Sequence, residues 1–131
     1  MVVDSSALLA ILLKEEGWER YFEALNTAPR RLMAAPSWLE ACLVFDNRDN
    51  EYAKRRLDIV VRDIRIEVVP FDASMAELAR YTHWHYGKGN KHPANLNFGD
   101  CMAYALAKST GEPLLFKGND FIHTDITPAL T

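Results

Sequence analysis

The sequence predicts an α/β fold built on a mostly parallel sheet of four to five strands, flanked by helices on both faces. Short apolar or β-branched runs alternate along the chain with longer segments in which apolar residues recur at helical spacing. Strands separated by helices are typical of βαβ units, whose strands pair in parallel under a cover of helices. With 131 residues, no repeat and no linker-like segment, the chain is expected to form one domain over residues 1–131.

The chain opens with a predicted strand followed by a predicted buried helix. Met1–Val3 is a short apolar run that stops at Asp4, and Ala7–Leu13 is apolar and consists mostly of helix formers. Trp18–Ala28 carries large apolar residues at helical spacing and predicts an amphipathic helix. After a turn, Leu32–Ala35 predicts the second strand.

The middle of the chain predicts two helices and a third strand. Ser37 is followed three residues later by Glu40, which is the spacing of a capping box that opens a helix running to about Asn47. Asn50–Arg65 predicts a further amphipathic helix, and Ile66–Val69 is β-branched around one glutamate and predicts a strand.

The last third predicts two helices, a polar loop and a fourth strand. Asp72 is placed to cap a helix over Ala73–Trp84, and a loop rich in glycine and lysine follows at Tyr86–Pro93. Asn97–Gly111 has a capping residue at one end, a terminating glycine at the other and an uncharged apolar centre, so it predicts a buried helix. Leu114–Phe116 predicts the fourth strand.

Composition and charge limit the classes of protein to consider. The chain is 49% hydrophobic and 25% charged, as in ordinary globular proteins, and its net charge is -3 with a pI of about 5.8. The surface as a whole therefore does not attract nucleic acid, and any contact with RNA requires a local basic patch or a bound cation. Cys42 and Cys101 lie in apolar helical patterns and are expected to be free thiols. Without a signal peptide or a run of membrane-spanning length, we expect a cytoplasmic protein.

Four acids occupy one kind of position in the predicted topology. Asp4 follows the first strand and Asp120 follows the fourth, whereas Glu40 and Asp100 each come three residues after a predicted helix cap. Ligands of open parallel α/β sheets bind outside the carboxyl ends of the strands, where the next helices begin. The four acids are therefore candidates to converge at one edge of the sheet.

Each acid has two interpretations. Acids in the first turn of a helix interact favourably with the helix dipole, by about 0.3–1 kcal/mol, and Glu40 fits a capping box without any site. Four caps at the same edge would instead crowd like charges, which raises pKa values unless a cation is present. Carboxylate oxygens suit Mg²⁺ or Mn²⁺, and such ions promote phosphodiester hydrolysis. Spacing thus favours a metal-dependent phosphodiesterase. No C-x-x-C or H-x-x-x-H pair supports zinc.

Four segments carry a resemblance to a known family. They are M-V-V-D-S-S-A-L at the start, S-W-L-E-A in the middle, and Y-G-K-G-N-K-H-P-A-N-L-N-F-G-D-C with L-L-F-K-G-N-D-F-I-H-T-D-I towards the end. Together they resemble a PIN-domain ribonuclease and, more closely, a VapC toxin of a type II toxin–antitoxin pair. The resemblance runs the length of the chain and implies a PIN-like fold.

The resemblance also implies roles for individual residues. Asp4, Glu40 and Asp100 match the metal-binding acids of the family. Many relatives carry two adjacent aspartates where this chain has Asn119-Asp120, so Asp120 is taken as the fourth acid and Asn119 as a supporting residue. Two more supporting residues are a hydroxyl and an acid of the T-D-I segment: Ser6 and Asp125.

Relatives are Mg²⁺- or Mn²⁺-dependent endoribonucleases that commonly act on tRNA or other structured RNA and are silenced by a cognate VapB antitoxin. The resemblance implies the same metal-assisted hydrolysis here, with no nucleophilic serine. Homodimers are common in the family, and the apolar early helices permit one. Lys88 and Lys91, in the polar loop, are candidates to contact RNA phosphates, as is Arg55, although its basic cluster is also explained by a solvated helix face.

Two functions other than RNA cleavage were weighed. A phosphoacceptor receiver domain needs a pair of acids after the first strand and an aspartate at the end of the third, whereas this chain has Asp4 alone and Pro70-Phe71-Asp72. That interpretation is rejected. A PIN-like module that binds RNA or protein without cleaving remains the alternative, and the presence of all four acids argues against it.

Overall fold

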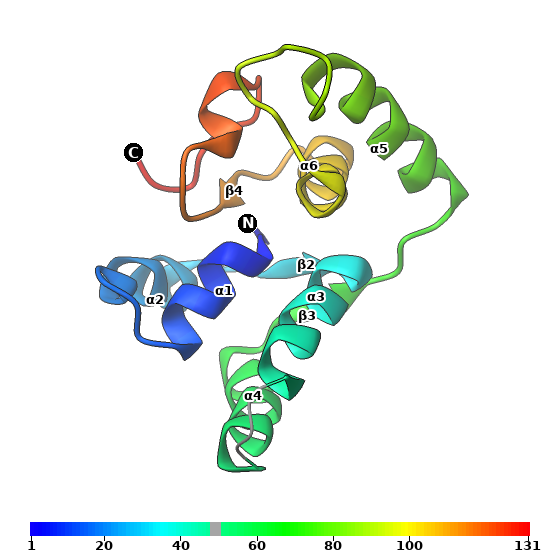
Figure 1. Ribbon diagram of the computed structural model, residues 1–131. Helices are drawn as coiled ribbons and strands as arrows, with labels where there is room; N and C mark the ends of the chain where they lie inside the picture. Colours follow the sequence, from blue (N-terminus) through cyan, green and yellow to red (C-terminus); the bar gives the residue numbers. More distant parts are fainter. Residues whose placement is uncertain (48–50) are drawn as a thin grey trace.

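The computed structural model describes residues 1–47 and 51–131, with side chains described for 1–47 and 55–131. Its centre is a sheet of four strands in the order β3-β2-β1-β4, and every neighbouring pair is parallel (Figure 1). The strands are β1 Val2–Val3, β2 Leu32–Ala34, β3 Glu67–Val69 and β4 Leu114–Leu115. The predicted parallel α/β sheet is confirmed, with four strands as the observed number.

Helices follow the strands as predicted. They are α1 Ser5–Leu12, α2 Trp18–Thr27, α3 Ala35–Asp46, α4 Glu51–Ile64, α5 Ala73–Tyr86 and α6 Phe98–Thr110, and a short 3₁₀ turn, η1, covers Asp120–His123. The helix predicted to begin at Asn50 is α4, and Asn50 itself lies outside the described residues. In the described part of the chain, no helix has the length and apolar character needed to cross a membrane.

Strand residues alternate between two hydrophobic cores, one on each face of the sheet. Val2, Leu32 and Leu114 pack with α5 and α6, whereas Val3 and Leu115 pack with α1 to α4. Adjacent strand residues point to opposite faces, so a run of only two or three residues supplies both cores. The predicted cover of helices on both faces is therefore confirmed, and parallel sheets buried in this way read as short, wholly apolar runs.

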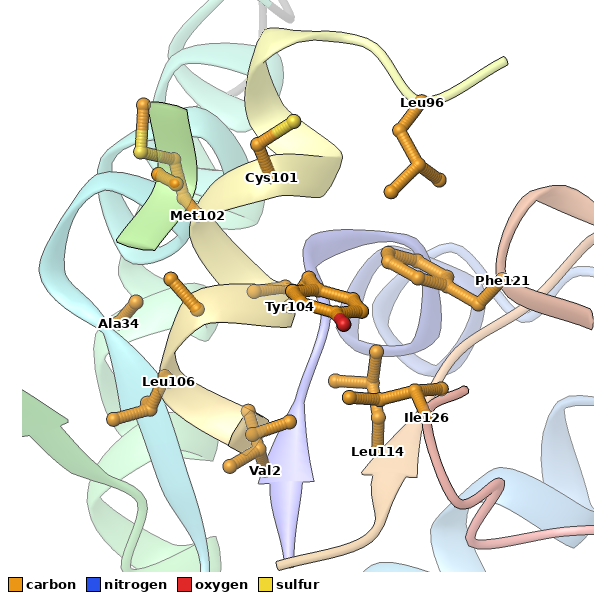
Figure 2. Close-up of a cluster of buried hydrophobic side chains, with 14 of the residues drawn as sticks. Val2, Ala34, Leu96, Cys101, Met102, Tyr104, Leu106, Leu114, Phe121 and Ile126 are labelled. Atoms are coloured by element: carbon orange, nitrogen blue, oxygen red, sulfur yellow. The ribbon is translucent and has the colours of Figure 1, made fainter. Parts of the chain in front are cut away.

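Helix α6 is the buried element predicted from its uncharged centre. Cys101–Ala107 are all buried, and Figure 2 shows Met102, Tyr104 and Leu106 among the strand residues of the first core. Asn97 caps its start, because Asn97 Oδ1 accepts the Asp100 N–H at 2.8 Å and Asp100 Oδ2 accepts the Asn97 N–H at 2.9 Å. Gly111 ends the helix in the left-handed conformation (φ 71°) that glycine adopts without strain. The predicted caps of this helix are confirmed.

The capping box predicted from Ser37 and Glu40 is wrong. Helix α3 begins three residues earlier, with Ala34 instead of Ser37 at the cap and Pro36 in the first turn, where the fixed φ of proline favours a helix start. Ser37 is then inside the helix, and its buried hydroxyl has no hydrogen-bond partner among the described residues. Glu40 therefore does not cap α3, and its carboxylate accepts a hydrogen bond from Ser5 instead.

Candidate active site

Asp4 is the most deeply buried acid at the carboxyl edge of the sheet. It directly follows β1 and caps α1, with 4% of its surface exposed. One carboxylate oxygen accepts the Ser6 N–H at 3.0 Å and also the Ser6 hydroxyl. The same hydroxyl oxygen accepts the Lys117 N–H at 3.0 Å, just beyond β4. Ser6 therefore fixes Asp4 and joins the ends of β1 and β4.

Glu40 reaches the same edge from α3. Its carboxylate accepts the hydroxyl of Ser5, in the first turn of α1, rather than a backbone N–H of its own helix. Its other oxygen lies against Gly99 in the first turn of α6, so closely that a Cβ at this position would overlap it. Gly99 is thus the residue that lets α6 approach the Glu40 carboxylate.

Asp100 and Asp120 complete the group. Asp100 is half-buried in the first turn of α6, and Asp120 is exposed as the first residue of η1, after β4. Desolvation by burial, and to a lesser extent the charges of Asp4, Asp120 and Glu40, raise the pKa of Asp100 to about 7. Each of the other three predicted acids therefore lies close enough to Asp100 for its charge to act on that carboxyl.

The pKa of Asp4 responds in the same way. Burial raises the pKa of its carboxyl from 3.8 to about 6, its hydrogen bonds to Ser6 lower it, and the charge of Glu40 raises it further. Two carboxyls at this edge therefore have pKa values near 6 and 7, and the charge of Asp4 is one of those that raise the pKa of Asp100. Groups perturbed by burial and by specific charges concentrate at functional sites.

The four carboxylates suit a divalent cation that keeps part of its water shell better than a cation coordinated by protein ligands alone. Among the described residues, no three His, Cys, Asp or Glu side chains are grouped closely enough to hold a metal ion. Mg²⁺ does not require three protein ligands, because it keeps several waters and binds through one or two carboxylates together with substrate phosphates. The side chains whose charges act on Asp100 are all carboxylates, and carboxylate oxygens are ligands that Mg²⁺ and Mn²⁺ prefer.

The other predicted residues lie in different environments. Asn119 is exposed and immediately precedes Asp120, and it makes no side-chain capping bond to η1. Asp125 is in the C-terminal segment and contacts α6 beyond its first turn, where its carboxylate accepts hydrogen bonds from the Tyr104 hydroxyl and the Lys108 ammonium. It is not among the charges that shift the pKa of Asp100.

The predicted RNA-contacting residues fall on two faces. Lys88 and Lys91 are exposed in the segment that joins α5 to α6, on the side of the sheet that α6 covers. Arg55 is exposed on α4, which packs against the other face and extends away from α5 and α6 (Figure 1). The structure therefore does not bring Arg55 together with the two lysines.

Two residues of the site were missed by the sequence interpretation. Ser5 donates its hydroxyl to the Glu40 carboxylate, a contact between α1 and α3 that no local sequence pattern indicates. The sequence did contain a signal for Gly99. A glycine inside a helix lowers the stability of the helix by about 0.5–1 kcal/mol relative to alanine, so its presence there indicates that another group approaches the backbone closely.

Comparison with known proteins identifies the family. The sequence profile of the PIN domain matches residues 1–126. Ribonuclease VapC42 of Mycobacterium tuberculosis is 46% identical over 131 residues, which are the whole of both chains. The chain belongs to the PIN-domain family, and within it to the VapC ribonucleases.

Solved structures of toxins share the fold. The M. tuberculosis VapC20 structure, described as a sarcin-ricin loop cleaving toxin, superposes with a TM-score of 0.74 over 96% of this chain and 95% of that one, at 15% identity. A toxin–antitoxin complex from Klebsiella pneumoniae gives a TM-score of 0.70 over 92% of this chain and 88% of that one, also at 15% identity. The PIN-like fold expected from the sequence motifs is thereby confirmed.

Proposed function

We propose that this VapC-family chain is a Mg²⁺- or Mn²⁺-dependent endoribonuclease toxin that hydrolyses phosphodiester bonds in structured RNA such as tRNA and is inhibited by a cognate VapB antitoxin. The observation that carries the proposal is the set of acids around Asp100, whose burial and mutual repulsion raise the pKa values of Asp4 and Asp100. Asp4, Asp100 and one or both of Glu40 and Asp120 would hold one or two cations, with water and substrate phosphate oxygens as further ligands.

The protein's own groups set up the site. Ser6 orients the Asp4 carboxylate through two hydrogen bonds, and Ser5 orients Glu40. The Asn97 N–H occupies one oxygen of Asp100 and so fixes the direction of that carboxylate. When bound at these carboxylates, a divalent cation would offset the negative charge of the phosphate oxygens. None of these roles needs a nucleophilic side chain.

The test compares two acids at helix starts. Asp100→Asn keeps the shape of the side chain and removes its charge, and it is expected to lower the RNA cleavage rate by about 100-fold or more, consistent with the loss of an electrostatic group at an active site. Asp72→Asn is the matched control, because Asp72 caps α5 through the Met75 N–H at 2.9 Å, and it is expected to cleave like the parent. Equal rates for the parent and Asp100→Asn in Mg²⁺ would refute the site, and equal parental rates in Mg²⁺ and in EDTA would refute the metal requirement.

The toxin role is tested in cells. Expression of the chain should arrest growth, and co-expression of the small protein encoded beside it should restore growth. The family of VapC ribonucleases and the K. pneumoniae toxin–antitoxin complex of similar fold support this proposal. Growth that continues with the active chain alone would contradict it, and RNA that is bound but never cut would favour a non-cleaving module.

We also propose a homodimer through an apolar surface beside the site. Phe98 is 78% exposed, and cavities of about 470 and 360 Å³ on either side of it share Pro36, Phe98 and Met102. Exposed Leu39 and Leu43 continue this surface along α3. Apolar surface of this kind is normally covered by a partner.

Analytical ultracentrifugation tests the interface. The parent should sediment as a dimer and Leu43→Asp as a monomer. Ile59→Asp is the control, because Ile59 is an exposed apolar residue on α4, and this variant should sediment as a dimer. A monomeric parent would refute the interface.

A further inference from the structure

A cavity lined with aromatic rings lies between α5, α6 and the C-terminal segment. Its volume is about 250 Å³, below the roughly 300 Å³ at which pockets for drug-sized ligands begin, so it suits a single ring system. Four rings contribute to its lining, and Lys108 and Asp125 supply its polar groups. The rings belong to Tyr81, His85, Tyr86 and Tyr104.

The rings form a graded surface from core to solvent. Tyr104 is only 5% exposed and packs against half-buried Tyr86 with 5.7 Å between ring centroids. Tyr81 is 56% exposed and lies against exposed His85, at 4.3 Å between centroids. Large exposed aromatic side chains beside a cavity have no role in the core. They do provide the faces on which unpaired nucleobases stack.

The polar edge of the cavity is fixed in place. Asp125 Oδ1 accepts the Tyr104 hydroxyl at 2.5 Å, and Asp125 Oδ2 accepts the Lys108 ammonium at 2.9 Å. These bonds hold the pKa of the Asp125 carboxyl below its usual range, so the group is an anion at neutral pH. Its side chain remains 54% exposed, and each carboxylate oxygen has a second lone pair to offer. An oriented acceptor therefore stands beside a cationic donor.

The cavity is connected to the acid site through α6. Asp100, Tyr104 and Lys108 follow one another at intervals of four residues, and residues four apart share a helix face. Four residues advance a helix by about 6 Å, so the cavity begins about one helical turn from Asp100. That separation is comparable to the spacing of neighbouring nucleotides. The segment with exposed Lys88 and Lys91 leads from α5 to the start of α6 on the same side of the sheet.

We propose that this cavity binds an unpaired guanine base of the substrate RNA, next to the phosphate that is cleaved. The inference rests on the proposed ribonuclease function and adds to it a subsite that reads one base. The guanine would stack on Tyr81 and His85 and present its Watson–Crick edge to Lys108 and Asp125.

Guanine is the base that completes the match. On its Watson–Crick edge the O6 acceptor is followed by two donors, N1–H and N2–H. Lys108 can donate to O6, as lysine commonly does to guanine, while Asp125 accepts from N1–H and N2–H. Uracil presents an acceptor where guanine has its second donor, and adenine and cytosine each offer one donor to the carboxylate. Only guanine therefore uses both oxygens of Asp125.

A purely structural interpretation is that Asp125 ties the C-terminal segment to α6. Figure 2 shows the Tyr104 ring extending from α6 towards Phe121 and Ile126 of that segment. Such a tie requires Asp125, Tyr104 and Lys108 but assigns nothing to Tyr81 or His85. Variants of the exposed rings consequently separate base binding from structural support.

The first experiment measures base preference in cleavage. A pool of RNA oligonucleotides with randomised sequence is digested in Mg²⁺ and the cut ends are sequenced. The parent should show guanine enriched at one position within one or two nucleotides of the cut. Asp125→Asn should reduce that enrichment by about five-fold to 100-fold, the range for losing a bidentate base contact. Tyr81→Ala should reduce it as well. Trp84→Ala is the matched control, because Trp84 is a 75% exposed aromatic on the same helix outside the cavity lining, and the enrichment should stay.

Either of two cleavage results overturns the subsite. One is a parent that cuts RNA without guanine enrichment; the other is an enrichment that Asp125→Asn and Tyr81→Ala leave unchanged. Enrichment of a different base that depends on Asp125 would overturn the assignment of guanine. Thermal unfolding of each variant shows whether Asp125→Asn is folded, and Tyr81→Ala tests the proposal where it is not.

A second measurement does not depend on cleavage. GMP and AMP are titrated separately into the full chain in EDTA while the ring signals of Tyr81 and His85 are followed by NMR. GMP should shift these signals at concentrations where AMP does not, and Asp125→Asn should abolish the difference. If no RNA is cut by any variant, the ribonuclease proposal fails, whereas absence of a GMP-specific shift in a protein that does cleave RNA refutes the base subsite alone.

Discussion

Asp4→Asn should make the metal-free protein more stable at pH 8 while removing its activity. Asp4 is buried, and burial raises its pKa to about 6, so ionising it in the folded state costs free energy. Asparagine is as good a helix cap as aspartate and keeps an oxygen that can accept from Ser6, and it carries no charge. The substitution therefore removes the charge cost and leaves the capping bonds.

The magnitude follows from the pKa difference. The carboxyl titrates at 3.8 when unfolded and at about 6 when folded, so between these values the folded state binds more protons. The free energy of unfolding then falls as pH rises from about 4 to about 6, and the full cost is present above that range. A difference of about 2 pKa units corresponds to about 3 kcal/mol. Asp100, with its pKa raised to about 7, acts in the same direction.

The assay is urea unfolding in EDTA at pH 4 and pH 8. The variant should exceed the parent by up to about 3 kcal/mol at pH 8 and by less than about 1 kcal/mol at pH 4. Millimolar Mg²⁺ should stabilise the parent at pH 8 and not the variant, because an ion that binds the folded state stabilises it by mass action. A stability difference that is the same at both pH values would refute the reasoning.

Two further substitutions change residues that position the acids, and a third changes a helix cap outside the site as a control. Gly99→Ala places a methyl group against the Glu40 carboxylate, so we expect cleavage to drop at least ten-fold while the unfolding midpoint changes little; unchanged cleavage would show that Glu40 is free to move. Ser6→Ala removes the hydroxyl that joins Asp4 to the Lys117 N–H, and it should lower both the cleavage rate and the free energy of unfolding, the latter by about 1–3 kcal/mol, as measured by urea titration. Asp72→Ala should cost about 0.5–2 kcal/mol with the cleavage rate per folded molecule intact, and a loss of cleavage would argue that α5 positions the site.

Local signals were sufficient for the elements of this fold. The strands are short apolar runs and the helices carry caps that act within three or four residues, as Asn97 and Asp72 do. The prediction that failed shows the limit of such signals. Ser37 and Glu40 have the spacing of a capping box, but the preceding strand, β2, ends at Ala34 and Pro36 favours an immediate helix start, so the helix begins before Ser37.

The convergence of the acids could be predicted from topology, but their partners could not. Parallel strands bring Asp4 and Asp120 to the same edge whatever their exact packing. The contact of Glu40 with Gly99 depends on how closely α3 and α6 approach, which is a property of side-chain packing across the core. The cavity with Asp125 is of the same kind, because its rings come from α5 and α6 and its carboxylate from residues after β4. The metal-binding roles of the four acids remain a prediction.

The order in which the acids occur along the chain has a consequence for synthesis. The two that follow β1 and β2 are made early, whereas Asp100 and Asp120 lie in the last third. A nascent chain that has reached Leu96 has neither of the later acids, and it lacks the helix that buries the first core. The polypeptide therefore has no complete acid site while most of it is being translated. A toxin built in this way becomes active only near the end of its own production.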